Sequence, residues 1–134
     1  YFLVQAAARS MIRGKKGGKV VTVASVAYRG EDMPKLAMMT AYNTAKAGVV
    51  GMTRGIAKEL KQYGINVNCV APGAVDTDMM ACYSQQDKQA LADETPLGRL
   101  CAAQDIADAA DFLLSGKASF ITGQTLAVDG GFTL

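Results

Sequence analysis

The chain has 134 residues, half of them hydrophobic, and a formal net charge of +2 at neutral pH. This is enough for one domain with an apolar core, and so small a charge favours neither a nucleic-acid nor a membrane partner. The absence of histidine excludes Ser-His-Asp hydrolysis and most catalytic zinc sites from these residues. No apolar run is long enough to span a membrane, and three cysteines without metal or redox spacing indicate a cytoplasmic protein.

The first half of the chain predicts a helix, a strand and a second helix. Residues 1–13 are rich in alanine and favour a helix that ends in a glycine-rich turn. Residues 20–24 form a β-branched run, which is typical of a strand buried on both faces of a parallel sheet. A long loop over residues 26–40 follows, and the next helix spans about residues 41–63, with Gly64 as its C-cap.

The second half predicts two further strands and two further helices. Residues 65–71 form an apolar strand, residues 84–92 a short polar helix, residues 104–115 another helix, and residues 125–128 the last strand. The alternation of strands and helices predicts parallel pairing with right-handed crossovers. Only three strands are predicted in these residues, so without a further neighbouring strand the first of them would be an open edge of the sheet.

Three polar side chains suggest a catalytic site. Tyr42 and Lys46 stand four residues apart and therefore share one helix face, and Ser25 directly follows the first predicted strand. An ammonium group beside a phenol favours the phenolate form, which allows a tyrosine to exchange protons with an alcohol or carbonyl oxygen. Ser25 can hydrogen-bond the same oxygen. The alternative is a surface tyrosine beside a solvated lysine, which we would favour if the pair stood alone.

The order of the motifs adds weight to the catalytic interpretation. A serine after a strand, a Tyr-x-x-x-Lys helix, a strand ending in Pro72-Gly73 and the closing segment 123–131 together resemble the C-terminal half of the short-chain dehydrogenase/reductase family. The resemblance covers residues 1–134 and implies the C-terminal part of a doubly wound, parallel-sheet, Rossmann-like α/β domain. These residues contain no G-x-G-x-x-G turn, so we expect a fragment that lacks the dinucleotide-binding half.

The resemblance implies an enzyme that interconverts a secondary alcohol and a ketone, with a 3-oxoacyl reductase as the nearest general match. It implies NAD or NADP as cofactor and no metal. By the same resemblance, Tyr42 is the acid/base and Ser25 orients the substrate oxygen. Lys46 supports the tyrosine and binds the nicotinamide ribose.

The turn after the second strand is the second part of the implied cofactor site. Ligands of open α/β sheets bind beyond the carboxyl ends of the strands, where this turn lies. The resemblance places the Val75 backbone and the Thr77 hydroxyl on the nicotinamide carboxamide, within a turn shaped by Pro72 and Gly73. The alternative is a rigid turn that only ends the strand.

Methionines suggest an apolar or flexible substrate. Five of the seven lie in the two loops expected to flank Tyr42, and methionine suits adaptable apolar surfaces. We predict Ala27, Tyr28, Met39 and Met79 as residues of the substrate pocket. An equally weighted alternative is that these methionines only fill space against the core.

Gly48, Gly51 and Gly55 fall on one face of the second helix. Such a stripe suggests close approach of another element, and the resemblance implies a subunit interface of a dimer or tetramer. The alternative is packing on the chain's own sheet.

Two other functions remain open. The chain could be a non-catalytic remnant or dimerisation fragment that cannot bind nucleotide alone, or part of a polyol or sugar dehydrogenase with the same catalytic residues and a different pocket. Because hydride transfer needs a dinucleotide held against Tyr42, we expect the 134 residues alone to show no turnover.

Overall fold

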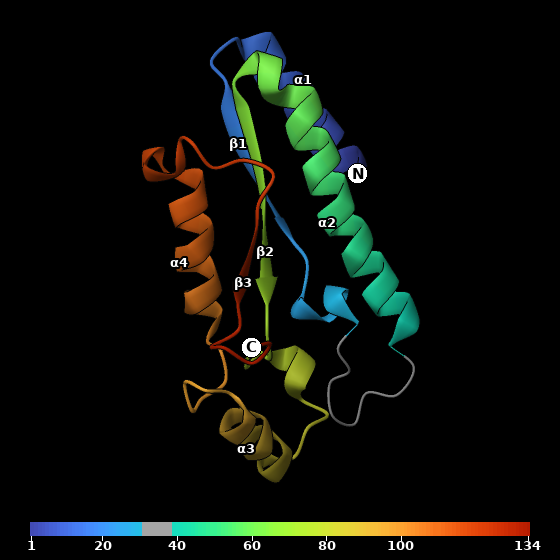
Figure 1. The fold of residues 1–134 in the computed structure, drawn as a ribbon, viewed down its shortest axis with the longest axis vertical. Coiled ribbons are helices and arrows are strands. Elements are labelled where there is room, and N and C mark those ends of the chain that lie inside the picture. The colour runs from blue at the N-terminus through green and yellow to red at the C-terminus, as the bar shows by residue number, and fades with distance from the viewer. Residues whose placement is uncertain (31–38) are drawn as a thin grey trace.

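The computed structural model describes residues 1–30 and 39–134, in which three parallel strands form one sheet (Figure 1). The strands lie side by side in chain order: β1 (Gly18–Val23), β2 (Ile65–Pro72) and β3 (Thr125–Val128). Gly18 lies opposite Ile65 in the first pair, and Cys69 lies opposite Thr125 in the second. The α/β class with a parallel sheet is thereby confirmed.

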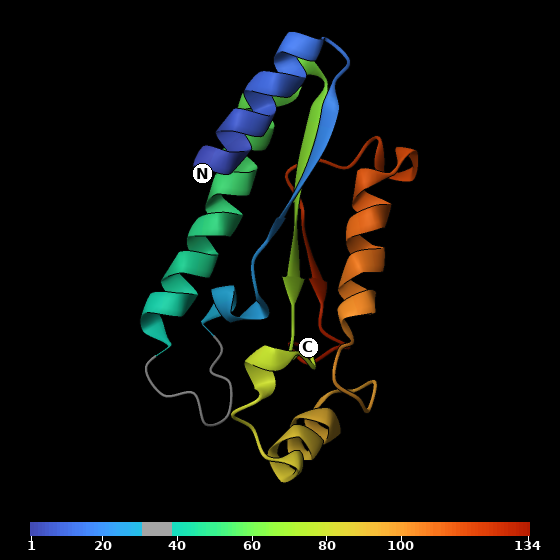
Figure 2. The same cartoon turned by 180° about the vertical axis from the view of Figure 1, so that it is seen from behind.

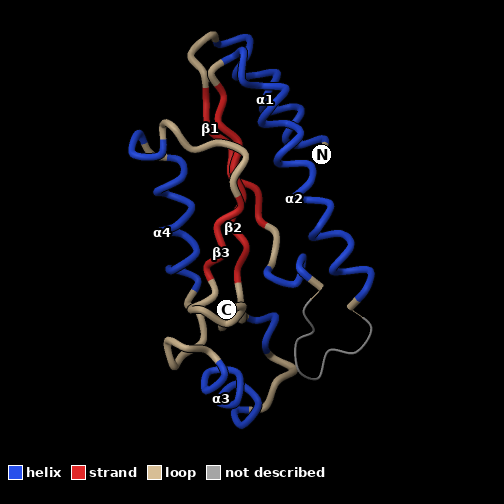
Figure 3. Tube along the Cα trace, viewed as in Figure 1, coloured by secondary structure: helices blue, strands red, loops and turns tan. Residues whose placement is uncertain are grey.

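Helices cover both faces of this sheet, as Figures 1 and 2 show from opposite sides. The α-helices are α1 (Phe2–Gly14), α2 (Thr40–Leu60), α3 (Gln85–Glu94) and α4 (Ala103–Leu114). Short 3₁₀ helices are η1 (Val26–Arg29), η2 (Lys61–Tyr63), η3 (Asp78–Met80) and η4 (Gly116–Ala118). Helices α1 and α2 lie on one face and α4 on the other, while α3 lies beyond the carboxyl ends of the strands (Figure 3).

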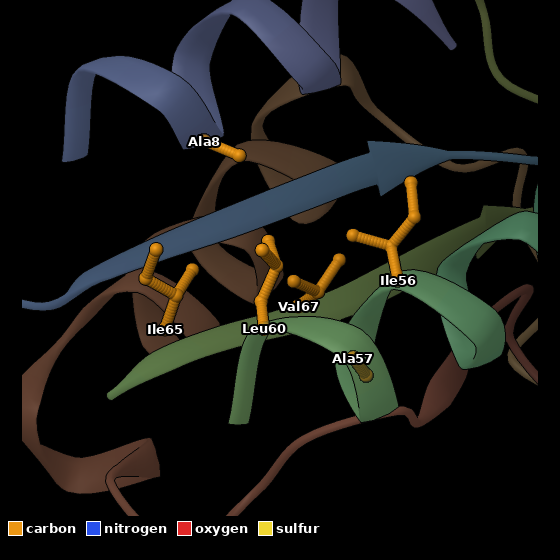
Figure 4. Packing of buried hydrophobic residues seen from close by; sticks show 6 residues of the cluster. All are labelled: Ala8, Ile56, Ala57, Leu60, Ile65 and Val67. Atoms are coloured by element: carbon orange, nitrogen blue, oxygen red, sulfur yellow. The ribbon is translucent and has the colours of Figure 1, made fainter. Parts of the chain in front are cut away.

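The apolar side chains of β2 alternate between the two faces. Val67 joins the cluster made with α1 and α2, in which Ile56 and Leu60 point towards the sheet (Figure 4). Val70 packs on the opposite face against Leu113 of α4. This alternation, the period of two of a β-strand, gives the central strand an apolar core on each side.

The two crossover connections have opposite hands. Both step the same way across the sheet, from β1 to β2 and from β2 to β3, yet α2 runs on one face and α4 on the other. Our prediction of right-handed crossovers throughout is therefore wrong for one of them. The physical reason is coverage, because α4 buries the face that α1 and α2 leave bare.

Strand β1 differs from its prediction in burial and in length. It is an edge strand of the described sheet, so most of it is half-buried and Val23 is 53% exposed, whereas we expected burial on both faces. It also ends at Val23, so Ser25 lies two residues beyond the strand, as the N-cap of the following 3₁₀ helix. Gly64 closes η2 in the left-handed conformation, with φ 65°, as predicted for a C-cap.

The glycine stripe of α2 faces outward. Gly48, Gly51 and Gly55 are exposed, and a Cβ added at any of them would have no neighbour within 4 Å. The stripe therefore does not pack on the chain's own sheet. No helix of the described residues is long and apolar enough to cross a lipid bilayer.

Gly51→Ala is expected to stabilise the chain by roughly 0.5–1 kcal/mol, because alanine loses less backbone entropy in a helix and has room here. Urea denaturation followed by circular dichroism measures the change. Gly73→Ala is the matched control and should destabilise, since its Cβ would lie 2.8 Å from the Asp129 Cβ. A loss of stability in Gly51→Ala would show that this face is occupied.

Candidate active site

The segment that contains Ser25 follows β1, and we call its residues 24–30 the serine loop. Ser25 is the N-cap of η1, and its Oγ accepts a hydrogen bond from the Ala27 amide at 3.3 Å. The Ser25 carbonyl accepts another from the Tyr28 amide at 3.0 Å. Because Ser25 is 9% exposed and engaged on both sides, its hydroxyl is held by the local backbone.

Tyr42 and Lys46 lie in the first turns of α2, close to the end of β1. The Lys46 Nζ is 5.6 Å from the centroid of the Tyr42 ring and donates a hydrogen bond to the Val23 carbonyl at 3.4 Å. Lys46 thus connects the tyrosine to the strand that precedes Ser25. Tyr42 is 39% exposed, so it is not part of the buried core.

The turn after β2 approaches the C-terminal turn closely. Pro72 ends β2, and the Gly73 amide donates to the Val128 carbonyl at 3.1 Å. No larger residue fits at Gly73, because its Cβ would lie 2.8 Å from that of Asp129. Gly73 is therefore explained by packing alone, as the rigid-turn interpretation requires.

The backbone N–H and C=O groups of Val75 take no part in the hydrogen bonds that join its segment to Cys101. It forms an isolated parallel bridge with Cys101, whose two hydrogen bonds use the Asp76 amide and the Ala74 carbonyl, each at 2.9 Å. Neither bond of the bridge therefore uses the N–H or the C=O of Val75. The exposed Thr77 donates to the Val75 carbonyl at 3.5 Å.

The residues predicted to line a substrate pocket lie in different environments. Ala27 is buried and Tyr28 packs partly against the core formed by Ala24, Val50, Cys69 and Ala71. Met39 is half-buried at the N-cap of α2. Met79 is 80% exposed, whereas its neighbour Met80 is buried against Leu91 of α3.

The predicted substrate pocket cannot be tested as a whole, because part of the loop behind the prediction lies outside the described residues. Two of the methionines behind it, Met33 and Met38, lie outside the described residues, as does most of the loop that lengthens the interval between Ser25 and Tyr42.

A cavity of about 130 Å³ lies beside α3 and α4, away from these residues. It is lined by Ala74, Thr95, Leu97, Arg99, Cys101, Asp105, Val128, Asp129 and Gly130. Arg99 and Asp105 are paired across it by two hydrogen bonds of 2.7 and 3.0 Å, which hold the pKa of the Asp105 carboxyl far below its usual range. Burial, and then the Asp105 charge, raise the pKa of the Cys101 thiol to about 11.

Cys101 is expected to resist alkylation at pH 8, where a pKa of about 11 leaves about one thiolate per thousand molecules. Cys82 is exposed and should react first with iodoacetamide, while the fully buried Cys69 should react only on unfolding. Labelling of each peptide, followed by mass spectrometry over time, measures the three rates. The Cys101 rate should rise about tenfold per pH unit up to pH 10, and equal rates for Cys101 and Cys82 at pH 8 would contradict the expectation.

A family model described as enoyl-(acyl carrier protein) reductase matches residues 1–133. The chain is 47% identical over 132 residues to an uncharacterized oxidoreductase, YmfI, of Bacillus subtilis, covering 98% of this chain and 52% of that one. It is 40% identical over 129 residues to the 3-oxoacyl-[acyl-carrier-protein] reductase FabG of Salmonella typhimurium, covering 96% and 51%. The chain belongs to the short-chain dehydrogenase/reductase family and spans about half the length of the curated relatives it matches.

Solved structures agree with this assignment. A 3-oxoacyl-[acyl-carrier protein] reductase from Brucella melitensis superposes with a TM-score of 0.88 at 33% identity, covering 98% of this chain and 48% of that one. A short-chain dehydrogenase from Leptospira borgpetersenii with bound NAD⁺ gives 0.84 at 30% identity, covering 98% and 51%. A gluconate 5-dehydrogenase from Burkholderia cenocepacia in complex with NADP and tartrate gives 0.85 at 34% identity, covering 96% and 49%.

Sequence reasoning missed one set of contacts near the site. Arg29, four residues after Ser25, reaches across to Thr133, and Thr133 is in turn bound by Asp129. At the level of sequence, Asp129 counted only as part of the closing segment 123–131. The sequence contains one signal, a single arginine four residues after Ser25. It does not indicate a partner, because Thr133 lies 104 positions away and no motif joins the two residues.

Proposed function

We propose that this chain carries the catalytic residues of an NAD(P)-dependent oxidoreductase that interconverts a secondary alcohol and a ketone. The observation that carries the proposal is the placement of Lys46, whose ammonium lies against the Tyr42 ring and the carbonyl of Val23. This arrangement places a cation beside a tyrosine hydroxyl, a group that can exchange a proton with an alcohol or carbonyl oxygen.

Three side chains take part in the proposed proton transfer. In the direction of reduction, the Tyr42 hydroxyl gives its proton to the carbonyl oxygen of the substrate, while Ser25 donates a hydrogen bond that orients this oxygen. Lys46 stabilises the phenolate that remains. A bound nicotinamide dinucleotide supplies the hydride in this direction and accepts it in the reverse direction.

The described residues suit one part of such a cofactor. The N–H of Val75 and the second lone pair of its C=O, whose first accepts from the Thr77 hydroxyl, are a matched donor and acceptor for a carboxamide. Lys46 would hold the ribose hydroxyls. NAD⁺ in one structural neighbour and NADP in another support a nicotinamide dinucleotide without favouring either form.

The substrate proposal follows the relatives and the methionines. A 3-oxoacyl reductase among the relatives, and Met39 and Met79 near the expected pocket, favour a ketone with an apolar chain. The likeness to a gluconate 5-dehydrogenase supports a polyol or sugar acid as the second candidate.

We also propose that the chain works in the cytoplasm as a homodimer or homotetramer. The exposed glycines of α2 would let a second copy approach closely, which is why they support this proposal. The test is the mass in solution by light scattering, where a purely monomeric chain over a wide concentration range would refute it.

The activity test compares these 134 residues with the same chain extended upstream in its reading frame. NADH or NADPH oxidation is followed at 340 nm with a 3-oxoacyl thioester, a simple ketone and a keto-sugar acid. We expect turnover of the thioester by the extended chain and none by the 134 residues alone. An extended chain with a glycine-rich turn that oxidises no cofactor with any ketone would favour the non-catalytic remnant, and preference for the keto-sugar acid would favour the second candidate.

A further inference from the structure

The serine loop is tied to the C-terminal turn by a chain of hydrogen bonds. Arg29, the last residue of η1, donates from Nη1 to the Thr133 Oγ1 at 2.7 Å and to the Thr133 carbonyl at 3.3 Å. The Thr133 Oγ1 lies 2.6 Å from the Asp129 Oδ2. Because a guanidinium only donates and a carboxylate only accepts, the Thr133 hydroxyl accepts from Arg29 and donates to Asp129.

Asp129 organises the far end of this chain. Its carboxylate also accepts from the Gly131 amide at 3.1 Å and from the Thr133 amide at 3.2 Å. Gly130 and Gly131 adopt φ values of 63° and 89°, which glycine allows at no steric cost and which bring these amides round to the carboxylate. Burial raises the pKa of Asp129, but the hydrogen bonds from Thr133 and Gly131 and the Arg29 charge outweigh it, so the pKa is lowered and the group is ionised at neutral pH.

The near end of the chain is the turn that holds Ser25. Helix η1 has four residues, and so short a 3₁₀ turn has little stability of its own. Ser25 begins the turn and Arg29 ends it, so an anchor at Arg29 restrains the backbone that binds the Ser25 hydroxyl. The other fixed side of the turn is Tyr28, which packs on the core.

We propose that Arg29, Thr133 and Asp129 form a positioning relay that holds the serine loop, and with it the Ser25 hydroxyl, in the geometry for catalysis. None of the three is a catalytic residue, since each acts through the loop. The relay joins the turn after β1 to the segment after β3. The catalytic part of this inference rests on the proposed function, whereas the mechanical part does not.

The test uses one matched pair of variants at Thr133. Thr133→Val keeps the shape of the side chain but breaks the hydroxyl link, and Thr133→Ser keeps the link. Hydrogen exchange of the Ala27, Tyr28 and Gly30 amides in the whole 134-residue chain reports directly on the turn. We expect about a fivefold or greater increase in exchange for Thr133→Val, none for Thr133→Ser, and no change in the amides of α4 for either.

Two further results keep the relay falsifiable. If Thr133→Val unfolds, Arg29→Gln replaces it, with Arg29→Lys as the variant that retains one donor and should recover part of the protection. In an active form of the protein, Thr133→Val should lower kcat about tenfold with little change in the KM for cofactor, and Thr133→Ser should restore kcat.

The outcomes separate the relay from the proposed activity. Unchanged exchange of the turn amides in Thr133→Val and Arg29→Gln would overturn the relay, whether or not the protein is an enzyme. Faster exchange, together with no ketone reduction by the chain extended upstream, would support the mechanical link and refute the proposed function. Turnover that depends on Tyr42 but not on Thr133, with unchanged exchange of the turn amides, would support the proposed function and refute the relay.

Discussion

Tyr42→Phe is expected to lower kcat for ketone reduction about 10³-fold in the form of the protein that turns over. The substitution removes the only proton that the proposed mechanism delivers to the carbonyl oxygen, and general acid catalysis contributes about 10²–10⁴-fold. The ring stays in place beside Lys46, so the fold should not change. Initial rates of NAD(P)H oxidation at saturating ketone give the loss.

The control for this variant is Tyr63→Phe. Tyr63 is similarly exposed, at 43% against 39% for Tyr42, and lies in η2 at the opposite end of α2. Its substitution should leave kcat within about twofold, as surface changes away from a site normally do. A Tyr42→Phe enzyme that keeps more than about a tenth of the activity would remove Tyr42 from the role of proton donor.

Lys46 offers a second check on the same mechanism. Lys46→Met removes the ammonium from the Tyr42 ring and from the Val23 carbonyl while keeping a long apolar stem. If Lys46 assists proton transfer at Tyr42, the variant should have a lower kcat even at saturating cofactor. A raised KM for cofactor with unchanged kcat would indicate that Lys46 acts only on cofactor binding.

Asn68→Leu is expected to destabilise the chain by about 2–4 kcal/mol. Asn68 is 1% exposed in the middle of β2. Its Nδ2 donates to the Ile121 carbonyl at 2.9 Å, and its Oδ1 accepts from the Gln124 amide at 3.0 Å. Leucine has a similar volume but leaves the part-buried Gln124 amide without this acceptor. It also removes one of two donors from the Ile121 carbonyl, which keeps the Asn66 Nδ2 at 2.9 Å. Unpaired polar groups away from water are costly.

The structural consequence should concentrate at β3. The segment after η4 is tied to β2 by these bonds and by the Val67 amide, which donates to the Thr122 Oγ1 at 3.0 Å. Loss of the Asn68 amide should therefore loosen the entry to β3 before the rest of the sheet. Urea denaturation followed by circular dichroism gives the free energy of unfolding, and hydrogen exchange of the β3 amides locates the effect.

Gln89→Leu is the matched control for Asn68→Leu. Gln89 also uses a side-chain amide, donating to the Asp93 Oδ1 at 2.8 Å, but on the exposed surface of α3. Its loss should change stability by no more than about 0.5 kcal/mol. Equal effects of the two variants would show that burial of the amide is not what makes Asn68 important.

Comparison of the predicted and observed elements shows where local information suffices. The β-branched run before Ser25 and the apolar run after Gly64 predicted strands within two residues of their observed bounds, because strand propensity and burial act along a few neighbouring residues. Tyr42 and Lys46 were expected on one helix face for the same reason, and the structure brings Lys46 to the Tyr42 ring. Their catalytic roles stay predictions.

Three features depended on contacts that no local pattern records. The half-buried state of β1 follows from its place at the edge of the described sheet, which its own residues do not encode. The opposite hands of the two crossovers follow from the need to cover both faces. The link from Arg29 to Thr133 joins residues 104 positions apart.

The amino-acid sequence by itself determined the α/β class, the order of the elements and the spacing of Tyr42 and Lys46, because periodicity and helix geometry are local properties. Only the tertiary structure decided that Gly73 must be a glycine, since the constraint is the approach of Asp129 from the other end of the domain. It also decided that Lys46 bonds the end of β1. Such contacts form only when distant parts of the chain fold together, so no local sequence pattern identifies the two residues as partners.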